Sequence, residues 1–257
     1  ETDTVWSGLT NPSDLASGTA PQMVNCQGGT YVAYIDTSWH ARLCRWNGSA
    51  WEDLYRPSAQ YVNEVALTGK EELYLVYADG DGSYAYAYSP SEKSGKTLGS
   101  SICGAEGANP SICVGDKVYA AYRSTDGNNR ITVKSYDASA DTWNALPDTG
   151  LQANSFCLKQ YGGSLYLLKD GTTFGSNGMY LYTMDPSSSD LKWRQLGTDA
   201  ITGNPASGMD LCFNGDSIYV IYYDGAQHVI KSSVWTGTAW ETFCPDISVQ
   251  TVSSLST

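Results

Sequence analysis

The sequence is poor in phenylalanine, methionine, histidine and basic residues, and these scarcities narrow what the protein can be. Lys and Arg together number 15 against 27 Asp and Glu, which gives a formal net charge of −12. Because no basic stripe is present to neutralise a phosphate backbone, nucleic acid is excluded as an expected partner. No apolar run approaches the roughly 18 residues needed to cross a bilayer, and the opening ETDTVWSGLT has neither the basic nor the apolar region of a signal peptide. We therefore expect no membrane insertion and a soluble chain, either processed or an excised domain.

Signatures of catalysis and of metal binding are also lacking. A hydrolytic triad needs a nucleophile beside a positioned histidine, but no G-x-S-x-G elbow accompanies the two histidines, His40 and His228. The cysteines form no C-x-x-C pair and no metal-ligand cluster with these histidines. We therefore expect no cofactor and no bound metal.

The cysteine count bears on disulfides and on cellular location. Seven is an odd number, so at least one thiol is free. Four cysteines end similar short apolar runs, VNC, SIC, SFC and DLC, and we expect them to be small buried core residues that form few or no disulfides. These four are Cys26, Cys113, Cys157 and Cys212. Free thiols fit a cytoplasmic location, which stays open beside the extracellular or cell-surface location suggested below.

Tyrosine (19), tryptophan (8) and glycine (26) are abundant, a balance that favours strands and tight turns over helices. Tryptophan recurs at intervals of roughly 45 to 50 residues, and the segment KTL fills the one gap in the series. The positions in register are Trp6, Trp51, Lys96-Thr97-Leu98, Trp143, Trp193 and Trp240. Each unit also contains an aromatic strand of the type YVAYID, and its equivalent tyrosines are Tyr31, Tyr74, Tyr119, Tyr166 and Tyr219.

A repeat of this length predicts an all-β, five-bladed β-propeller in which every blade has four short antiparallel strands. The tyrosine lies in the second strand and the tryptophan in the fourth, where we expect it to fill the gap to the next blade. We expect one domain over residues 1–257, with units at 10–54, 55–100, 101–146, 147–196 and 197–243 and a tail at 244–257. The segment WSGL at residues 6–9 resembles one more outermost strand, which makes six such strands for five units. An incomplete six-bladed propeller is therefore the alternative.

Two repeat families resemble these units. The stretch YDASADTWNALP, with a Tyr-Asp turn before a Trp and a Leu-Pro exit, resembles the kelch repeat. The pattern YVAY-x-D followed by WNG-x-x-W is similar to bacterial propeller repeats that are often found in exported proteins. The five-bladed architecture is similar to that of tachylectin-type lectins, which hold amino sugars between blades. These resemblances imply a propeller fold, and the last implies carbohydrate binding.

Two sets of polar residues recur at one end of the expected blades, because the loop after the second strand lies on the same face as the linker between blades. An aspartate ends or follows each second strand: Asp36, Asp79, Asp126, Asp170 and Asp224. An asparagine opens four of the inner strands: Asn63, Asn109, Asn154 and Asn204. Such residues stabilise turns, and a carboxylate, an amide and an exposed aromatic ring together also bind sugars.

The loop Asp36-Thr37-Ser38-Trp39-His40 is the sharpest candidate for ligand binding, because Trp39 does not belong to the packing pattern of the repeat. We expect a non-catalytic binding module on a secreted or cell-surface protein, a monomer or a domain of a larger chain, whose partner is a glycan. A scaffold that binds a surface protein is the alternative.

An enzyme that acts on glycosides is the third hypothesis, since such an enzyme needs two carboxylates across its site. Five-bladed glycosidases usually place their base on the innermost strand of the first blade. Here that strand reads PQMVNC and contains no acid. Glu64, which opens an inner strand beside Asn63, is the one acid to test.

Overall fold

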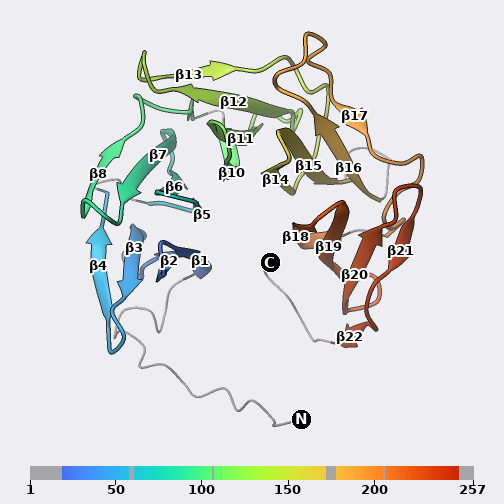
Figure 1. Ribbon diagram of the computed structural model, residues 1–257, viewed down its shortest axis with the longest axis horizontal. Helices are drawn as coiled ribbons and strands as arrows, with labels where there is room; N and C mark the ends of the chain where they lie inside the picture. Colours follow the sequence, from blue (N-terminus) through green and yellow to red (C-terminus); the bar gives the residue numbers. More distant parts are fainter. Residues whose placement is uncertain (1–18, 58–60, 106, 172–177, 205, 249–257) are drawn as a thin grey trace.

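The computed structural model describes residues 19–57, 61–105, 107–171, 178–204 and 206–248. Over these residues the chain forms five antiparallel sheets around one axis, with no helix (Figure 1). Accordingly, no helix in the described part could span a membrane. The predicted all-β, five-bladed propeller is confirmed.

Each blade is a meander of four strands that runs from the axis outward (Figure 1). Blade 1 contains β1 (Thr19–Cys26), β2 (Gly29–Ile35), β3 (Ala41–Trp46) and β4 (Trp51–Tyr55). Blade 2 contains β5 (Glu64–Gly69), β6 (Leu73–Ala78), β7 (Gly82–Ser89) and β8 (Ser94–Thr97), and β9 (Cys103–Gly104) pairs with β7. Blade 3 contains β10 (Gly107–Val114), β11 (Val118–Ser124), β12 (Ile131–Asp137) and β13 (Thr142–Ala145).

The last two blades have the same order. Blade 4 contains β14 (Phe156–Tyr161), β15 (Ser164–Asp170), β16 (Met179–Met184) and β17 (Arg194–Gln195). Blade 5 contains β18 (Ala206–Asn214), β19 (Ser217–Asp224), β20 (Val229–Trp235) and β21 (Trp240–Thr242), and β22 (Ile247–Ser248) pairs with β20.

Apolar side chains on both faces of the strands form a separate core between each pair of successive blades. Four of the repeat tyrosines belong to these cores, as predicted: Tyr31 and Tyr119 are almost fully buried, and Tyr74 and Tyr166 are partly buried. Tyr219 in blade 5 is partly buried but contacts the ring of Phe243 instead. Burial of each large apolar side chain stabilises the fold by about 1.5–3 kcal/mol, so the repeated sequence pattern directly specifies the repeated packing.

The fourth-strand tryptophans pack in the direction opposite to the prediction. The Nε1–H of Trp143 in blade 3 donates to the carbonyl oxygen of Leu98 in blade 2 at 2.9 Å. Its ring lies 5.3 Å from that of Tyr136 on the neighbouring strand, on the face that joins the core between blades 2 and 3. The tryptophan therefore covers the gap to the preceding blade, because strand register puts it on the same face as Tyr136.

The loop after the second strand and the linker to the next blade meet at one end of every blade. In blade 2, β9 in the linker pairs with the start of β7, and in blade 5, β22 pairs with the start of β20. In blade 4, Met179 bridges Thr202. This pairing brings the aspartate loops and the asparagine segments to a common surface.

Within the described residues, the ring is open between blade 5 and blade 1. Successive blades pack strand against strand from blade 1 to blade 5, whereas blades 5 and 1 make no comparable strand packing within the described residues (Figure 1). The segment WSGL at residues 6–9, on which the six-bladed alternative depended, lies outside the described residues.

All seven cysteines are free thiols. Cys26 and Cys113 are buried as predicted, but Cys157 is only partly buried and Cys212 is exposed. Cys113 and Cys212 occupy the same register, opposite Tyr119 and Tyr219. Cys113 belongs to the core between blades 3 and 4, whereas Cys212 belongs to none of the cores formed by the described residues.

We expect a thiol-reactive dye to titrate seven thiols in the denatured, unreduced protein. In the native protein the two exposed thiols, Cys212 and Cys244, should react well before the others because burial blocks access. The measurement is the stoichiometry and time course of dye release. A count of five or fewer in denaturant would reveal a disulfide and contradict the structure.

Candidate functional site

The loop between β2 and β3 holds Trp39 in a fixed and unusual conformation. The Asp36 carboxylate accepts hydrogen bonds from the backbone N–H groups of Ser38 (2.9 Å) and His40 (3.0 Å), and the Trp39 N–H donates to the Asp36 carbonyl (2.9 Å). Trp39 has a φ of 62°, in the left-handed region that a bulky residue rarely adopts. Its side chain is 54% exposed. A strained backbone that holds an aromatic ring in solvent is typical of a binding site.

A second exposed aromatic residue, Tyr61, lies beside this loop. The backbone N–H of Val62 donates to the Trp39 carbonyl at 2.8 Å, which fixes the linker against the loop. Tyr61 has a φ of 63° and is 73% exposed. The sequence prediction missed it, although the criterion that singled out Trp39 applies equally, since the corresponding linker positions of the other units carry no aromatic residue.

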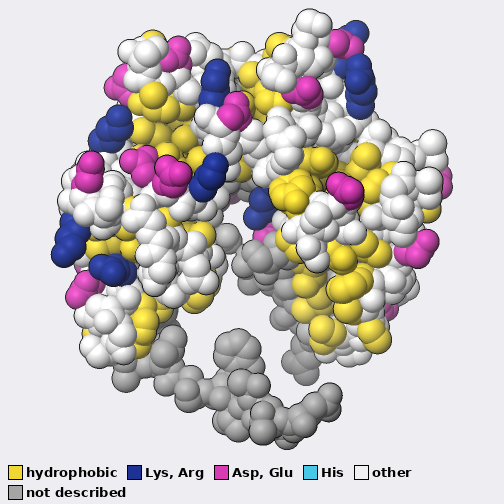
Figure 2. Space-filling view, viewed as in Figure 1, with side chains coloured by type: hydrophobic (Ala, Val, Ile, Leu, Met, Phe, Trp, Pro, Cys, Tyr) yellow, Lys and Arg dark blue, Asp and Glu magenta, His cyan; other side chains and the backbone are white. Residues whose placement is uncertain are grey.

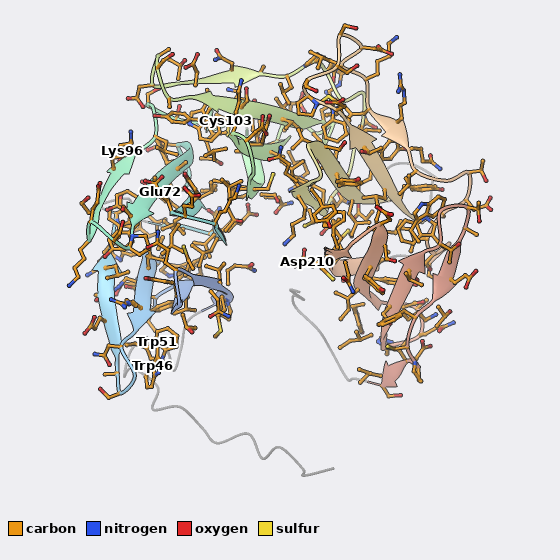
Figure 3. All side chains as sticks on the ribbon, viewed as in Figure 1. Trp46, Trp51, Glu72, Lys96, Cys103 and Asp210 are labelled. Atoms are coloured by element: carbon orange, nitrogen blue, oxygen red, sulfur yellow. The ribbon has the colours of Figure 1, made fainter. Side chains whose placement is uncertain are left out.

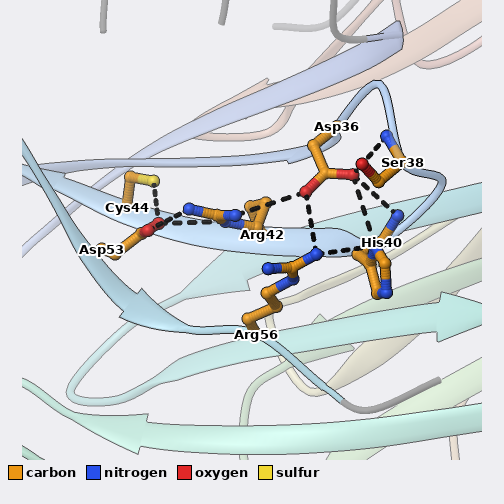
Figure 4. Close-up of polar contacts among 7 residues, drawn as sticks. All are labelled: Asp36, Ser38, His40, Arg42, Cys44, Asp53 and Arg56. Carbon is orange, nitrogen blue, oxygen red and sulfur yellow. Dashed lines mark hydrogen bonds and ion pairs between the residues drawn. The ribbon is translucent and has the colours of Figure 1, made fainter. Parts of the chain in front are cut away.

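Asp36 belongs to a cluster of charged side chains on blade 1 (Figure 4). Arg42 pairs with Asp36 at 3.3 Å and also with Asp53 on β4, whose carboxylate accepts from the Cys44 thiol at 3.2 Å. The Arg56 guanidinium lies 2.9 Å from His40 Nδ1 and 3.8 Å from the Asp36 carboxylate. Sequence analysis did not single out either arginine, because they come from strand β3 and the segment after β4 and meet Asp36 only in the folded blade.

Charge and hydrogen bonding fix the protonation states of this cluster. Burial raises the pKa of Asp36, but the N–H groups of His40 and Ser38 and the charge of Arg56 outweigh it, so the pKa lies below its usual value. Burial, with Asp53 nearby, raises the pKa of Cys44 to about 12, so it remains a thiol. An arginine can only donate, so His40 Nδ1 accepts from Arg56.

Two other aspartates stabilise their own turns. The Asp79 carboxylate accepts from the N–H groups of Asp81 (2.8 Å) and Gly82 (3.0 Å). Asp126 is exposed, and its carboxylate accepts from the Ser124 hydroxyl (2.7 Å) and from the Asn128 backbone (3.0 Å). These contacts are the turn chemistry that the sequence allows, so any contact of Asp79 or Asp126 with a ligand stays a prediction.

The remaining two aspartates are buried and connect their loop to the neighbouring linker. Asp170 accepts from the N–H groups of Asn154 (3.0 Å) and Ser155 (3.1 Å). Asp224, fully buried, accepts from the Asn204 amide (2.9 Å) and pairs with Lys231 (3.1 Å). Both carboxylates therefore hold the loop and the linker together through hydrogen bonds.

Three of the predicted asparagines lie just before an inner strand and Asn109 lies within one, and two of the four link blades. The Asn109 amide donates to the Asn154 carbonyl at 2.7 Å, and the Asn109 backbone N–H donates to the Glu64 carboxylate. Burial raises the pKa of Glu64, although Asn109 and Arg123 oppose this. Asn63 is exposed and lines, with Glu64 and Asn109, a cavity of about 210 Å³. Asn109 and Asn154 thus contribute to the contacts between blades 2, 3 and 4.

A buried ion pair lies near the central opening, where Figure 3 labels Asp210. Its carboxylate lies 3.0 Å from Lys159 Nζ and accepts from the Cys157 thiol at 3.1 Å. Burial raises the pKa of Cys157 well above its usual value, so it is a donor and not a nucleophile. Over the described residues, no group of His, Cys, Asp and Glu could hold a metal ion.

At the opposite end of the strands, a groove of about 800 Å³ runs between blades 2 and 3. Tyr74, Tyr136 and Leu98 line it, and charged groups of both signs surround it, including Glu72 and Lys96 (Figures 2 and 3). The Tyr74 hydroxyl donates to Glu72 at 2.8 Å. Tyr74 is half-buried and Tyr136 is buried, so both present little ring face to the groove.

No protein-family model and no curated protein matches the chain, so the kelch-like resemblance has no support from these comparisons. Among solved structures, the chain is similar to the SapL1 lectin in complex with alpha methyl fucoside, with a TM-score of 0.67 and 14% identity over 92% of this chain and 84% of that one. At this identity the likeness shows the propeller fold alone.

Two glycoside hydrolases give weaker matches. They are the Bacteroides ovatus xyloglucan-locus protein GH43B (TM-score 0.48, 14% identity, 71% of this chain and 40% of that one) and CoXyl43, a β-xylosidase/α-arabinofuranosidase from a compost metagenome (0.49, 12%, 88% and 94%). The chain thus spans less than half the length of the first. Neither likeness is close enough to bear on function.

Proposed function

We propose that the protein is a non-catalytic carbohydrate-binding module that holds a saccharide on Trp39 and Tyr61, at the junction of blades 1 and 2. The observation that carries this is the pair of exposed aromatic residues on two backbone segments joined by the hydrogen bond from Val62 to Trp39. Aromatic rings with an apolar face and a polar edge stack on the apolar face of a pyranose. The likeness in fold to a fucoside-binding lectin is compatible with this proposal.

The state of the carboxylates favours binding over hydrolysis. A glycosidase needs a carboxyl group that stays protonated near neutral pH and acts as general acid, beside a second carboxylate. Asp36 and Asp224 instead have a pKa below the usual value, and their oxygens accept hydrogen bonds from their own loops. Glu64 has a raised pKa, but its carboxylate is occupied by the Asn109 N–H.

A protein segment is the second candidate ligand, and the groove of about 800 Å³ between blades 2 and 3 favours it. The volume of the groove suits a peptide, and the charges of both signs along its rim would fix the orientation of that peptide.

As the module would meet a glycan or a surface protein, we propose a secreted or cell-surface location. The seven free thiols suit the cytoplasmic alternative.

A glycan array followed by calorimetric titration tests the proposed function. We expect the wild-type protein to bind a saccharide, and Trp39→Ala to weaken that binding at least about tenfold, since loss of one stacking ring is worth about 1.4 kcal/mol. The melting temperature should stay within about 2 °C, because the ring is exposed and packs on no core cluster.

The matched control is Tyr161→Ala, which removes another exposed aromatic ring, 41% exposed on blade 4. It should leave saccharide binding unchanged. Saccharide binding that survives Trp39→Ala would contradict the proposed site. Protein binding that is lost in Glu72→Lys, with no saccharide bound at all, would assign the function to the groove instead.

A further inference from the structure

Next to Trp39, the Asp36 carboxylate faces inward and the Arg56 guanidinium faces solvent. The Asp36 side chain is only 7% exposed, and its oxygens already accept from Ser38, His40 and Arg42. The Arg56 side chain, in contrast, is 48% exposed. The group that sequence analysis proposed as a ligand contact is therefore turned inward, and the cation next to it faces solvent.

Arg56 has unused donor capacity. A guanidinium carries five N–H groups, and the contacts of Arg56 with described residues are the one to His40 Nδ1 at 2.9 Å and the ion pair with Asp36 at 3.8 Å, both through Nη2. Because His40 Nδ1 accepts one of these N–H groups, most of the guanidinium has no partner among the described residues. A ligand that satisfies these groups must supply acceptors.

Arg56 is the more distant of the two arginines that pair with Asp36. Arg42 already pairs with Asp36 at 3.3 Å, and its side chain is buried between Asp36 and Asp53. A half-exposed arginine at 3.8 Å contributes little to stability. The structural ion pair is thus Arg42 with Asp36, and the Arg56 guanidinium remains available to an incoming group.

We propose, on the basis of the function proposed above, that the saccharide carries a carboxylate, as a uronic or sialic acid does, and that Arg56 binds this carboxylate beside the stacking rings. The planar fork of an arginine matches a carboxylate in a bidentate contact, which is both stronger and more specific than a neutral hydrogen bond. The net charge of −12 disfavours non-specific adsorption of an anionic polysaccharide, so binding must come from such a local contact.

The experiment compares a uronic-acid oligosaccharide with the same oligosaccharide after reduction of its carboxyl groups, by calorimetric titration at constant ionic strength. We expect the wild-type protein to bind the acidic form about tenfold tighter, which corresponds to about 1.4 kcal/mol. In Arg56→Gln the two affinities should become equal at the level of the reduced form. In Arg56→Lys part of the preference should remain, because the charge stays but the fork is lost.

Controls separate this inference from the proposed function. Arg130→Gln changes another exposed arginine, paired with Asp148 in blade 3, and should keep the full preference. Trp39→Ala should weaken both oligosaccharides. The inference is overturned if the two forms bind wild type equally, or if Arg56→Gln keeps the preference, while the saccharide-binding function stands in both cases. A sulfated analogue that binds as tightly as the uronate overturns the carboxylate assignment. Absence of all saccharide binding overturns both proposals.

Discussion

Asp36→Ala is expected to lower the free energy of unfolding by about 3 kcal/mol, because it removes one of the two carboxylates that pair with the buried charge of Arg42. It also removes the acceptor of two backbone N–H groups that hold the β2–β3 loop. Trp39 then loses its fixed left-handed conformation, so we expect saccharide affinity to fall at least as far as in Trp39→Ala. Urea unfolding with an unchanged m-value measures the first effect, and calorimetric titration measures the second.

The matched control for this variant is Asp79→Ala. Asp79 occupies the corresponding loop of blade 2 but accepts only from the N–H groups of its own turn, and it is not in an ion pair with a described residue. We expect a cost of about 1 kcal/mol or less and unchanged binding. Equal losses in the two variants would show that the Asp36 cluster has no special role.

The second large effect is a loss of stability in acid that depends on Asp224. Burial raises the pKa of this carboxyl group, but bonds from Asn204, Lys231 and the N–H groups of Gln227 and Ala226 outweigh burial, and the pKa is lowered. A carboxyl whose pKa is lower in the folded state binds protons more tightly in the unfolded state. Its stabilisation is therefore complete above the ordinary aspartate value of about 3.9 and is lost as pH falls through the lower folded value.

We expect Asp224→Asn to be less stable than wild type at pH 7, by about 3 kcal/mol, because Lys231 loses its buried partner. Since the variant has no carboxyl group to protonate, its stability should fall less than that of wild type between pH 5 and pH 2. Urea unfolding across this range measures both differences. Parallel curves for the two proteins would show that Asp224 does not contribute to the acid dependence.

The fold was predictable because the residues that specify it repeat. Tyr31 and its equivalents mark each second strand, and the prediction holds even in blade 2, where Lys96 and Thr97 replace the tryptophan and Leu98 is buried behind them. The direction in which Trp143 packs was not predictable from spacing, because it depends on which face of the sheet the strand register assigns to it. The exposure of Cys212 was not predictable either, because repeat counting does not reveal that this position lies outside the cores of the described residues.

The candidate site was predictable only in part. Trp39 could be found because it departs from the repeat, and Tyr61 departs from it in the same way. The functions of Arg42 and Arg56 could not be found, since they depend on distances between a loop, a strand and a linker that no local pattern encodes. For the same reason the spacing of Asp36 predicted a ligand contact, whereas the fold encloses its carboxylate.

The left-handed conformation of Trp39 has a consequence for the thermodynamics of binding. Such a conformation costs a bulky residue about 1–2 kcal/mol, and here the hydrogen bonds to Asp36 and from Val62 offset that cost when the loop folds, before any ligand arrives. A ligand then meets a backbone that has no conformational freedom left to lose. The entropy change of association should thus come from released water and the ligand itself, and encounter should proceed without a slow loop-closing step.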